Sequence, residues 1–273
     1  GKRIDIVLHR GAGAYICGEE TAMMNSIEGR RGNPRIKPPF PAQAGLFALP
    51  TTINNVETLA SVSHILNRGA EWYKGLCLSN PKSTGTKLIS VCGHVQRPGN
   101  YEVTMGTPMK DLIFDMCGGM KPGRTLKAVI PGGSSVPIMT AAETEDCLLD
   151  YEGVVARGSM LGSAGMIVMD DSTDMVYQIW RLARFYAHES CAQCTQCREG
   201  TAWTTKILER ILAGKGKAAD LDLLLSLSEN MTGKTICVLS DSCAAPIVSG
   251  IAKFRSEFDA YLSGARQPAL AMA

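Results

Sequence analysis

The sequence predicts a mixed α/β fold followed by an all-helical region, and three observations support this prediction. A short apolar run comes before a glycine-rich segment and a helical pattern near the N-terminus. Alternating apolar residues, which are typical of strands, dominate the middle of the chain. From residue 171 onward, apolar residues recur at helical spacing instead. We therefore expect three parts, covering residues 1–75, 76–170 and 171–273.

The first part is predicted to contain a strand, a glycine-rich turn and a helix. Residues 4–8, Ile-Asp-Ile-Val-Leu, have the strand pattern, and the helix runs through residues 23–27. The turn between them contains Gly11, Gly13 and Gly18. Glycines let backbone amides approach a ligand and a helix N-terminus attracts anions, so this unit suits a phosphate or the edge of a flavin. The spacing matches neither the dinucleotide fingerprint nor the P-loop, and a plain tight turn explains the glycines equally well.

A proline-rich segment, residues 32–41, comes next. Its Pro and Gly content excludes regular structure, and it exposes Lys37 and Phe40. Phe40 can stack on a base or fill the core, and the pattern does not decide between the two. Residues 51–58 then supply Asn and Thr side chains that suit the N-terminal cap of a helix continuing to Leu66.

The middle part is predicted to be a β-grasp module. Residues 87–95 and 100–105 have the pattern of two strands joined in a hairpin. A short helix over residues 109–116 follows, and residues 126–130 and 166–169 supply returning strands.

The last part is predicted to be a four-helix bundle, because four successive segments keep their apolar residues on one side. These residues are Val176, Ile179, Trp180, Ala183 and Tyr186, then Trp203, Ile207 and Ile211, then Leu221, Leu224 and Leu225, then Ile247, Ile251, Phe254, Phe258 and Tyr261. Three cysteines fall between the first and second segments, and Cys237 falls between the third and fourth. In an up-and-down bundle these two loops meet at one end.

The cysteines of these loops predict a [4Fe–4S] cluster. Cys191, Cys194 and Cys197 stand at two-residue gaps, and Cys237 follows forty positions after the last of them. Three closely spaced thiolates can bind three corners of a cubane, and a fourth from a distant segment completes it. Cys243 is a rival for the fourth position, because it lies only six residues beyond Cys237.

Other uses of these thiols fit the spacing less well. Structural zinc sites draw pairs of Cys or His from two knuckles, whereas here three cysteines form one run, so zinc is the weaker alternative. Ten cysteines in 273 residues are too few for a disulfide scaffold, and without a signal peptide we expect reduced, intracellular thiols. A two-cluster ferredoxin is also disfavoured, because it places its fourth cysteine soon after the third and before Pro.

The charge and hydropathy of the chain limit the classes of partner that we expect. The formal net charge is +2, from 28 basic and 26 acidic residues with no long block of one sign, so nothing indicates a nucleic-acid partner. No segment offers eighteen consecutive apolar residues, so we expect any membrane association to come through partner proteins.

Two segments resemble signatures of a known family. Residues 11–26 and residues 189–200 are similar to those of the flavin-bearing, NADH-oxidising subunit of respiratory complex I. The segments Lys37-Pro-Pro-Phe40, Asn54-Asn55 and Thr-Ile-Cys237 occur in the same order as in that family, so the resemblance covers essentially the whole chain. The same subunit type occurs in NAD-linked hydrogenases and formate dehydrogenases, from which the sequence separates complex I poorly.

The resemblance implies a fold and a function. The implied fold is a Rossmann-like FMN domain whose upstream half is absent from this chain, an SLBB-type ubiquitin-like β-grasp domain, and a helical bundle carrying the cluster. The implied function is electron input: NADH gives a hydride to FMN, and single electrons pass to the [4Fe–4S] cluster. A non-catalytic metal-binding scaffold is the alternative from a different class.

The resemblance also implies roles for individual residues. Implied FMN contacts are Gly18, Glu19, Glu20, Ile53, Asn54, Asn55 and Thr58. Implied NAD(H) contacts are Lys37 and Phe40, with Phe40 stacking on adenine and Glu20 close to the nicotinamide. Implied cluster ligands are Cys191, Cys194, Cys197 and Cys237, which leaves Cys243 unused.

The resemblance also implies partner proteins. These are a thioredoxin-like [2Fe–2S] subunit and a larger iron–sulfur subunit, in a cytoplasmic assembly that is peripheral to the inner membrane.

The sequence differs from the family signature at two positions between the cysteines. Ala192 stands where the second signature usually has Gly, and Gln196 where it usually has Pro. We expect a looser loop between the ligands. Arg198 either raises the cluster potential or forms a salt bridge.

Overall fold

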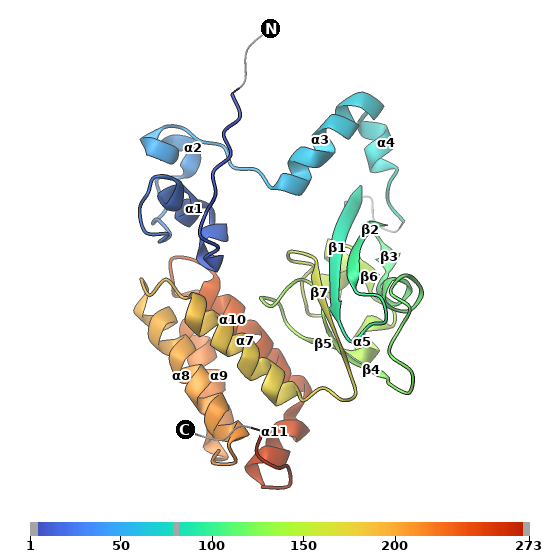
Figure 1. Ribbon diagram of the computed structural model, residues 1–273, viewed down its shortest axis with the longest axis vertical. Coiled ribbons are helices and arrows are strands. Elements are labelled where there is room, and N and C mark those ends of the chain that lie inside the picture. The colour runs from blue at the N-terminus through green and yellow to red at the C-terminus, as the bar shows by residue number, and fades with distance from the viewer. Residues whose placement is uncertain (1–4, 79–81, 270–273) are drawn as a thin grey trace.

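The structure is a computed structural model and describes residues 5–78 and 82–269. Helices and strands divide into an N-terminal segment, a β-sheet region and a helical bundle (Figure 1). The predicted mixed α/β architecture with a helical region is therefore confirmed for the chain as a whole.

The N-terminal segment is divided between two places. The 3-10 turn η1 (Tyr15–Gly18), helix α1 (Glu20–Ile27), helix α2 (Pro41–Ala44) and the turn η2 (Leu46–Ala48) lie at one end of the bundle (Figure 1). Helices α3 (Val56–Arg68) and α4 (Ala70–Lys74) lie beside the sheet instead. The side chain of Glu57 accepts the backbone N–H of Leu88 at 2.8 Å and pairs with Lys87, which fixes α3 to the first strand.

The strand predicted for residues 4–8 is not formed by the described residues 5–8. Ile6, Val7 and Leu8 are 93%, 87% and 89% exposed, and no strand lies within residues 5–74. An extended segment becomes a strand only when a neighbour pairs with it, and the described part of the chain supplies none there. Residue 4 lies outside the described residues.

The middle region contains a mixed five-stranded sheet in the order β2-β1-β7-β4-β5. Its strands are β1 (Thr86–Gly93), β2 (Gly99–Thr104), β4 (Leu126–Ile130), β5 (Met139–Thr140) and β7 (Gly165–Asp170). The predicted hairpin is confirmed, since β1 and β2 are antiparallel, whereas β1 and β7 run parallel. Gly93 allows this parallel contact, because a Cβ there would lie 2.1 Å from the carbonyl oxygen of Val168.

Smaller elements cover the sheet. They are β3 (Thr107–Pro108), which pairs with β6 (Leu148–Leu149), the π-helical turn η3 (Asp111–Met116), and helices α5 (Ala141–Thr144) and α6 (Tyr151–Ala156). Alternate residues of the sheet enter different cores, as the two-residue period of a strand requires. Val129 and Val168 pack with η3 in one core, whereas Ala128, Ile130 and Met169 join the core of the bundle.

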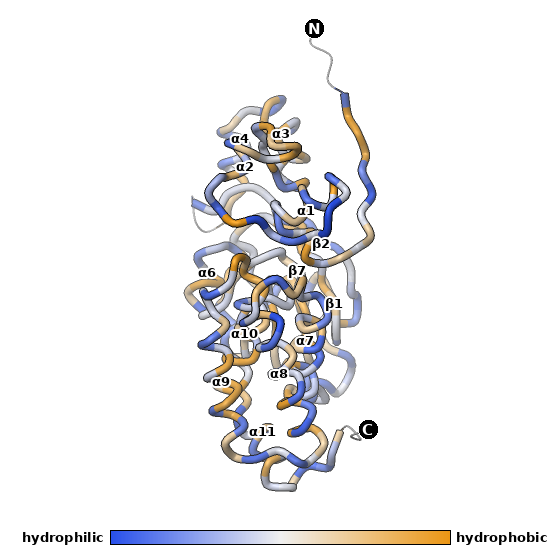
Figure 2. Tube along the Cα trace, turned by 90° about the vertical axis from the view of Figure 1, so that its left-hand side faces the viewer, coloured by the Kyte–Doolittle hydropathy of each residue, from blue (hydrophilic) through white to orange (hydrophobic). Residues whose placement is uncertain are grey.

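The bundle consists of α7 (Met175–Glu189), α8 (Thr195–Leu212), α9 (Ala219–Met231) and α10 (Leu239–Lys253), with α11 (Arg255–Leu262) at the far end. Each helix alternates between apolar and polar residues along its trace (Figure 2), as expected when one face is buried. The fourth apolar pattern was expected to be one helix, but the backbone leaves helical geometry at Phe254 and starts α11.

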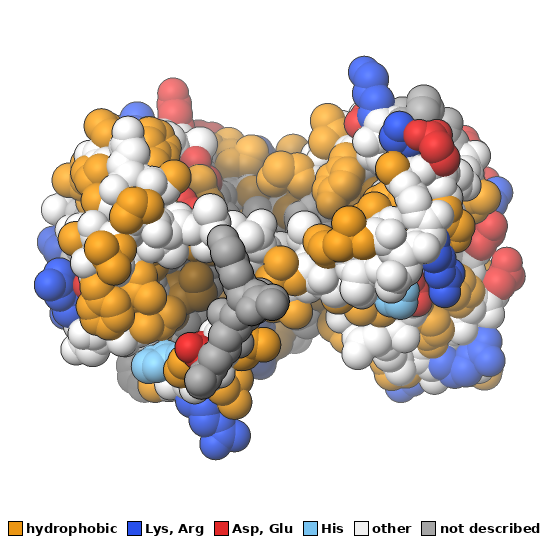
Figure 3. Space-filling view, turned by 90° about the horizontal axis from the view of Figure 1, so that it is seen from above, with side chains coloured by type: hydrophobic (Ala, Val, Ile, Leu, Met, Phe, Trp, Pro, Cys, Tyr) orange, Lys and Arg blue, Asp and Glu red, His pale blue; other side chains and the backbone are white. Residues whose placement is uncertain are grey.

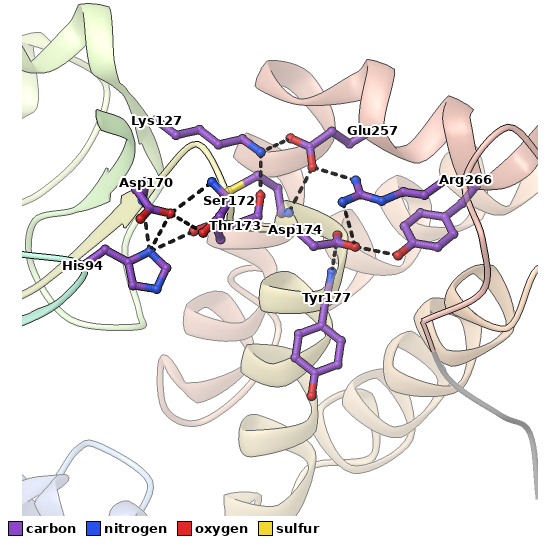
Figure 4. Close-up of polar contacts among 11 residues, drawn as sticks. His94, Lys127, Asp170, Ser172, Thr173, Asp174, Tyr177, Glu257 and Arg266 are labelled. Carbon is purple, nitrogen blue, oxygen red and sulfur yellow. Dashed lines mark hydrogen bonds and ion pairs between the residues drawn. The ribbon is translucent and has the colours of Figure 1, made fainter. Parts of the chain in front are cut away.

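Ion pairs and hydrogen bonds join the sheet to the bundle (Figure 4). Lys127 of β4 contacts Glu257 of α11 at 2.7 Å, and Glu257 also contacts Arg266 at 3.2 Å. Arg266 contacts Asp174 at 3.3 Å, and Asp174 accepts the hydroxyl of Tyr261 at 2.5 Å. Together with the shared core, this network places the sheet firmly against α7 and α11.

Large apolar side chains are exposed at the end of the molecule that carries α2 and α3. They include Ile36, Phe47, Leu49, Val56 and Leu66. The view from this end shows hydrophobic side chains on both lobes of the molecule (Figure 3). No helix among the described residues is both long enough and apolar enough to cross a bilayer.

Candidate functional site

The four predicted ligand cysteines lie in or next to two neighbouring turns at one end of the bundle. Cys191 and Cys194 lie between α7 and α8, and Cys237 lies between α9 and α10 (Figure 1). Cys197 was expected in the loop but lies in the first turn of α8. The backbone N–H of Ile236 lies 3.4 Å from the sulfur of Cys194, so the two turns are in direct contact.

The sulfurs are partly shielded from water and accept hydrogen bonds. Cys197 is only 7% exposed, and the hydroxyl of Ser190 lies 3.3 Å from its sulfur. The sulfur of Cys194 accepts the backbone N–H of Ile236. Burial raises the pKa of Cys197 and of Cys237, because a thiolate loses water there, and neighbouring cysteines add to the effect. Bound iron would supply the positive charge that four thiolates in this place need.

The donor set fits a [4Fe–4S] cluster, because free thiols are its usual ligands. All ten cysteines are free of disulfide bonds. Within residues 5–78 and 82–269, no three His, Cys, Asp or Glu side chains converge closely enough to hold one ion. In a cubane each thiolate binds its own iron, so the four sulfurs surround the cluster without converging on one point.

The turn between Cys191 and Cys194 is strained but well held. Ala192 has φ +65°, in the left-handed region that a residue with a Cβ rarely adopts. Its N–H donates to the hydroxyl oxygen of Ser190 at 3.3 Å, and its carbonyl accepts Nη1 of Arg198 at 3.0 Å. The Nε of Arg198 also contacts Glu199 at 2.8 Å. The looser loop expected from Ala192 is therefore fixed by side chains, and the charge of Arg198 is paired.

The glycine-rich segment docks directly on the cysteine turns. The N–H of Tyr15 donates to Glu189 at 3.0 Å, and the ring of Tyr15 meets that of Phe185 edge-on at 5.1 Å. Nη2 of Arg31 donates to the carbonyl of Cys191 at 3.1 Å. A pocket of about 420 Å³ lies between the two segments and is lined by Gly13, Cys17, Arg31, Glu189 and Cys191, among others.

Four of the predicted cofactor contacts lie together beside this junction. The carboxylate of Glu19 caps α1 by accepting the N–H groups of Thr21 and Ala22, each at 2.9 Å. Lys37 pairs with Glu20 and lies 3.6 Å from Glu19. The hydrogen bond from Lys37 to Glu20 raises the pKa of Lys37, so its ammonium is retained. Gly18 is the last residue of η1, immediately before this cap.

The other predicted contacts lie apart from that group. Phe40 is 54% exposed, so it does not fill the core. Asn55 caps α3 by accepting the N–H of Glu57 at 2.8 Å, as the pattern predicted. Asn55 and Thr58 line a cavity of about 450 Å³ between α3 and β1. No hydrogen bond or ion pair in the described parts of the chain links Ile53, Asn54, Asn55 or Thr58 to Glu20.

Sequence reasoning missed several residues that build the site. Ser190 holds Cys197 and Ala192, and its position directly before the first cysteine was its only signal. Tyr15, Arg31 and Glu189 join segments about 160 residues apart or more, which no local pattern reports.

Three family models match successive parts of the chain. Residues 177–261 match the family described as the NADH-ubiquinone oxidoreductase-F iron-sulfur binding region. Residues 1–64 match the Nuo51 FMN-binding domain, and residues 87–177 match the SLBB domain.

Curated relatives match nearly the whole chain. The NADH-quinone oxidoreductase F subunit of Rickettsia bellii (strain OSU 85-389) is 50% identical over 95% of this chain and 62% of its own length. One of two such F subunits of Rhizobium meliloti (strain 1021) is 51% identical over 95% of this chain and 59% of its own length. The chain thus spans about three fifths of the length of these relatives.

Solved structures with the same fold include two of an NAD⁺-reducing [NiFe]-hydrogenase. The H₂-reduced state gives a TM-score of 0.83 at 38% identity, covering 92% of this chain and 42% of the other. The air-oxidised state gives 0.81 at 35% identity, covering 96% and 48%.

Proposed function

We propose that this chain, which is similar to NADH-quinone oxidoreductase F subunits over about three fifths of their length, serves NADH oxidation, with FMN and a [4Fe–4S] cluster as cofactors. One observation carries the proposal. Residues 11–31, within the part that matches the FMN-binding domain, pack beside the cysteine turns through the contacts of Tyr15 with Glu189 and of Arg31 with Cys191. A flavin held by this segment would lie close to the cluster.

The parts of the chain have separate tasks in this proposal. Residues 1–75 form part of a Rossmann-like unit for FMN and NADH, residues 76–170 form a ubiquitin-like β-grasp domain, and residues 171–273 form the cluster-carrying bundle. Cys191, Cys194, Cys197 and Cys237 hold the cluster. When bound, FMN takes two electrons as a hydride and the cluster takes them one at a time.

In this proposal, the site residues of the first part bind and orient the flavin and NADH rather than transfer protons. Gly18, Glu19, Glu20, Ile53, Asn54, Asn55 and Thr58 are the proposed flavin contacts. Lys37 and Phe40 are the proposed NADH contacts, and the exposure of Phe40 leaves its ring free to stack on adenine. Glu19 fixes the start of α1 and Lys37 is held by Glu20, so the acidic pair keeps a defined position.

The proposed assembly is a multi-subunit redox complex. Its other members include a thioredoxin-like [2Fe–2S] subunit and a larger iron–sulfur subunit, and membrane association comes through such partners. A hydrogenase or formate dehydrogenase assembly is the second candidate. The match to the NAD⁺-reducing hydrogenase supports the hydrogenase form of this candidate. Identity is higher to the quinone-linked subunits, at 50% against 38%, so we place those first.

Mixing the holoenzyme with NADH and freezing it at successive times tests the function. We expect the flavin absorbance to bleach first and the paramagnetic signal of the reduced cluster to follow. Enzyme in which dithionite develops that signal but NADH does not would contradict the proposal. Metal analysis that finds zinc in place of iron would support the scaffold alternative.

A further inference from the structure

We propose that the hydroxyl of Ser190 raises the reduction potential of the cluster by donating a hydrogen bond to the sulfur of Cys197. This inference rests on the proposed function, because it assumes that the four cysteines bind a [4Fe–4S] cluster. Ser190 ends α7 and lies directly before the first ligand. Its role is to position a dipole toward the cluster, without contacting iron.

The direction of the hydrogen bond follows from the atoms around Ser190. Its oxygen lies 3.3 Å from the sulfur of Cys197 and also accepts the N–H of Ala192 at 3.3 Å. A sulfur bound to iron is a thiolate and carries no proton. The hydroxyl must therefore be the donor in the contact with Cys197. Because Cys197 is only 7% exposed, water screens this contact little.

Ser190 differs from the other group that donates to a sulfur of the proposed ligands. Ile236 donates to Cys194, but it uses its backbone N–H group. In the described parts of the chain, Ser190 supplies the one hydrogen bond to a ligand sulfur that comes from a side chain. It is therefore the contact that a substitution can remove.

Arg198, the residue that the sequence first offered for this role, is otherwise engaged. Its Nε contacts Glu199 at 2.8 Å and its Nη1 donates to the carbonyl of Ala192 at 3.0 Å. The carboxylate of Glu199 therefore offsets part of its charge. The hydrogen bond from Ser190 acts directly on a ligand atom.

The physical effect has a definite sign. Reduction adds one electron to the cluster, no bond breaks, and the hydroxyl proton stays on Ser190. The added negative charge spreads onto the sulfurs, so a donor to sulfur stabilises the reduced state more than the oxidised one. Loss of the donor therefore makes the cluster harder to reduce.

Redox titration of the holoenzyme, followed by the paramagnetic signal of the reduced cluster, tests the inference. At a fixed applied potential, Ser190→Ala should lower the ratio of reduced to oxidised cluster by about threefold to tenfold; tenfold corresponds to about 59 mV for one electron. Ser190→Thr keeps a hydroxyl and should restore most of the ratio. In deuterated buffer, the magnetic coupling of an exchangeable proton near the cluster should be lost in Ser190→Ala and kept in Ser190→Thr.

Two further variants separate this effect from a structural one. Ser242→Ala removes a hydroxyl just beyond Cys237 that donates to the carbonyl of Val238, so it should not change the potential. Ser190→Ala combined with Ala192→Gly removes the strain that Ser190 helps to hold. If the single variant retains little iron, the double variant should retain the cluster and show the lowered potential.

The outcomes distinguish the inference from the function on which it rests. Full iron content with an unchanged potential and an unchanged exchangeable-proton coupling in Ser190→Ala would overturn the role of Ser190 and leave the function intact. An unsubstituted holoenzyme without iron or the paramagnetic signal would overturn both.

Discussion

At the scale of single residues, backbone conformation and helix capping determine structural roles that the residue type alone does not indicate. Ala192 adopts a left-handed conformation where the family usually has Gly, and Glu19, which the resemblance implies as a flavin contact, also caps helix α1. Neither role can be recognised from spacing. Both lead to measurable expectations.

Ala192→Gly should stabilise the turn between the cysteines. Glycine adopts φ +65° without the strain that a Cβ causes, which we expect to raise the free energy of unfolding by about 0.5–1 kcal/mol. Ala187→Gly is the matched control, because the same change inside α7 should lower that free energy by about 0.5–1 kcal/mol. Denaturant titration of both variants measures the difference, and a shift of the same sign in both would refute the argument.

Glu19→Ala should destabilise the start of α1. It removes the acceptor for two backbone N–H groups, and we expect a loss of about 0.5–2 kcal/mol in the free energy of unfolding. Glu20→Ala removes an exposed pair with Lys37 and should cost less, at most about 1 kcal/mol. Amide exchange in residues 20–24 should rise in the first variant and stay close to normal in the second. Equal exchange in both would contradict the capping role.

At the scale of elements, the sequence predicted what local patterns determine. The β1–β2 hairpin, α1, α3 and the four bundle helices follow from two-residue or helical periodicity. The prediction of a strand over residues 5–8 was wrong, because a strand forms only when a neighbouring strand pairs with it. The helix break at Phe254 was missed, because the apolar pattern continues across it. Neighbouring cysteine turns could be anticipated from an up-and-down bundle. Docking of the glycine-rich segment on them could not, because it depends on contacts such as Tyr15 with Glu189.

Arg31→Ala should loosen the docking of the glycine-rich segment. It removes the hydrogen bond to the carbonyl of Cys191, so amide exchange in residues 12–18 should increase and the cluster should be lost sooner on dilution. Arg30→Ala is the control, because the exposed Arg30 side chain only approaches Glu28, at 3.6 Å, on the surface of the same segment. Identical exchange in the two variants would show that Arg31 does not hold the segment.

At the scale of the whole molecule, stability depends on how the sheet docks on the bundle. Lys253 of α10 donates to the carbonyl of Ile138 at 2.9 Å and contacts Glu143 of α5 at 2.8 Å. The hydroxyl of Ser249 accepts the N–H of Ile138 at 2.9 Å. These contacts and the Lys127–Glu257 pair explain how two regions share one core.

Acid should weaken this docking through Glu143. Burial acts to raise the pKa of Glu143, but hydrogen bonds from Lys253 and Thr140 outweigh it and lower the pKa. The stabilising contribution is therefore present above the unfolded pKa of about 4.3 and is lost as the pH falls through the lower, folded value. Glu143→Gln should show a smaller loss of stability between about pH 6 and pH 3, whereas Glu145→Gln should keep the full loss. Parallel acid curves for both variants would exclude Glu143 as the cause.

The paramagnetic signal of the dithionite-reduced protein tests the central claim most directly, when Cys237→Ala is compared with Cys243→Ala. Both cysteines are free, and they lie six residues apart near the same end of the bundle. We expect Cys237→Ala to lose or alter the [4Fe–4S] signal together with bound iron, and Cys243→Ala to keep both. An unchanged signal and iron content in Cys237→Ala, or their loss in Cys243→Ala alone, would contradict the proposed ligand set.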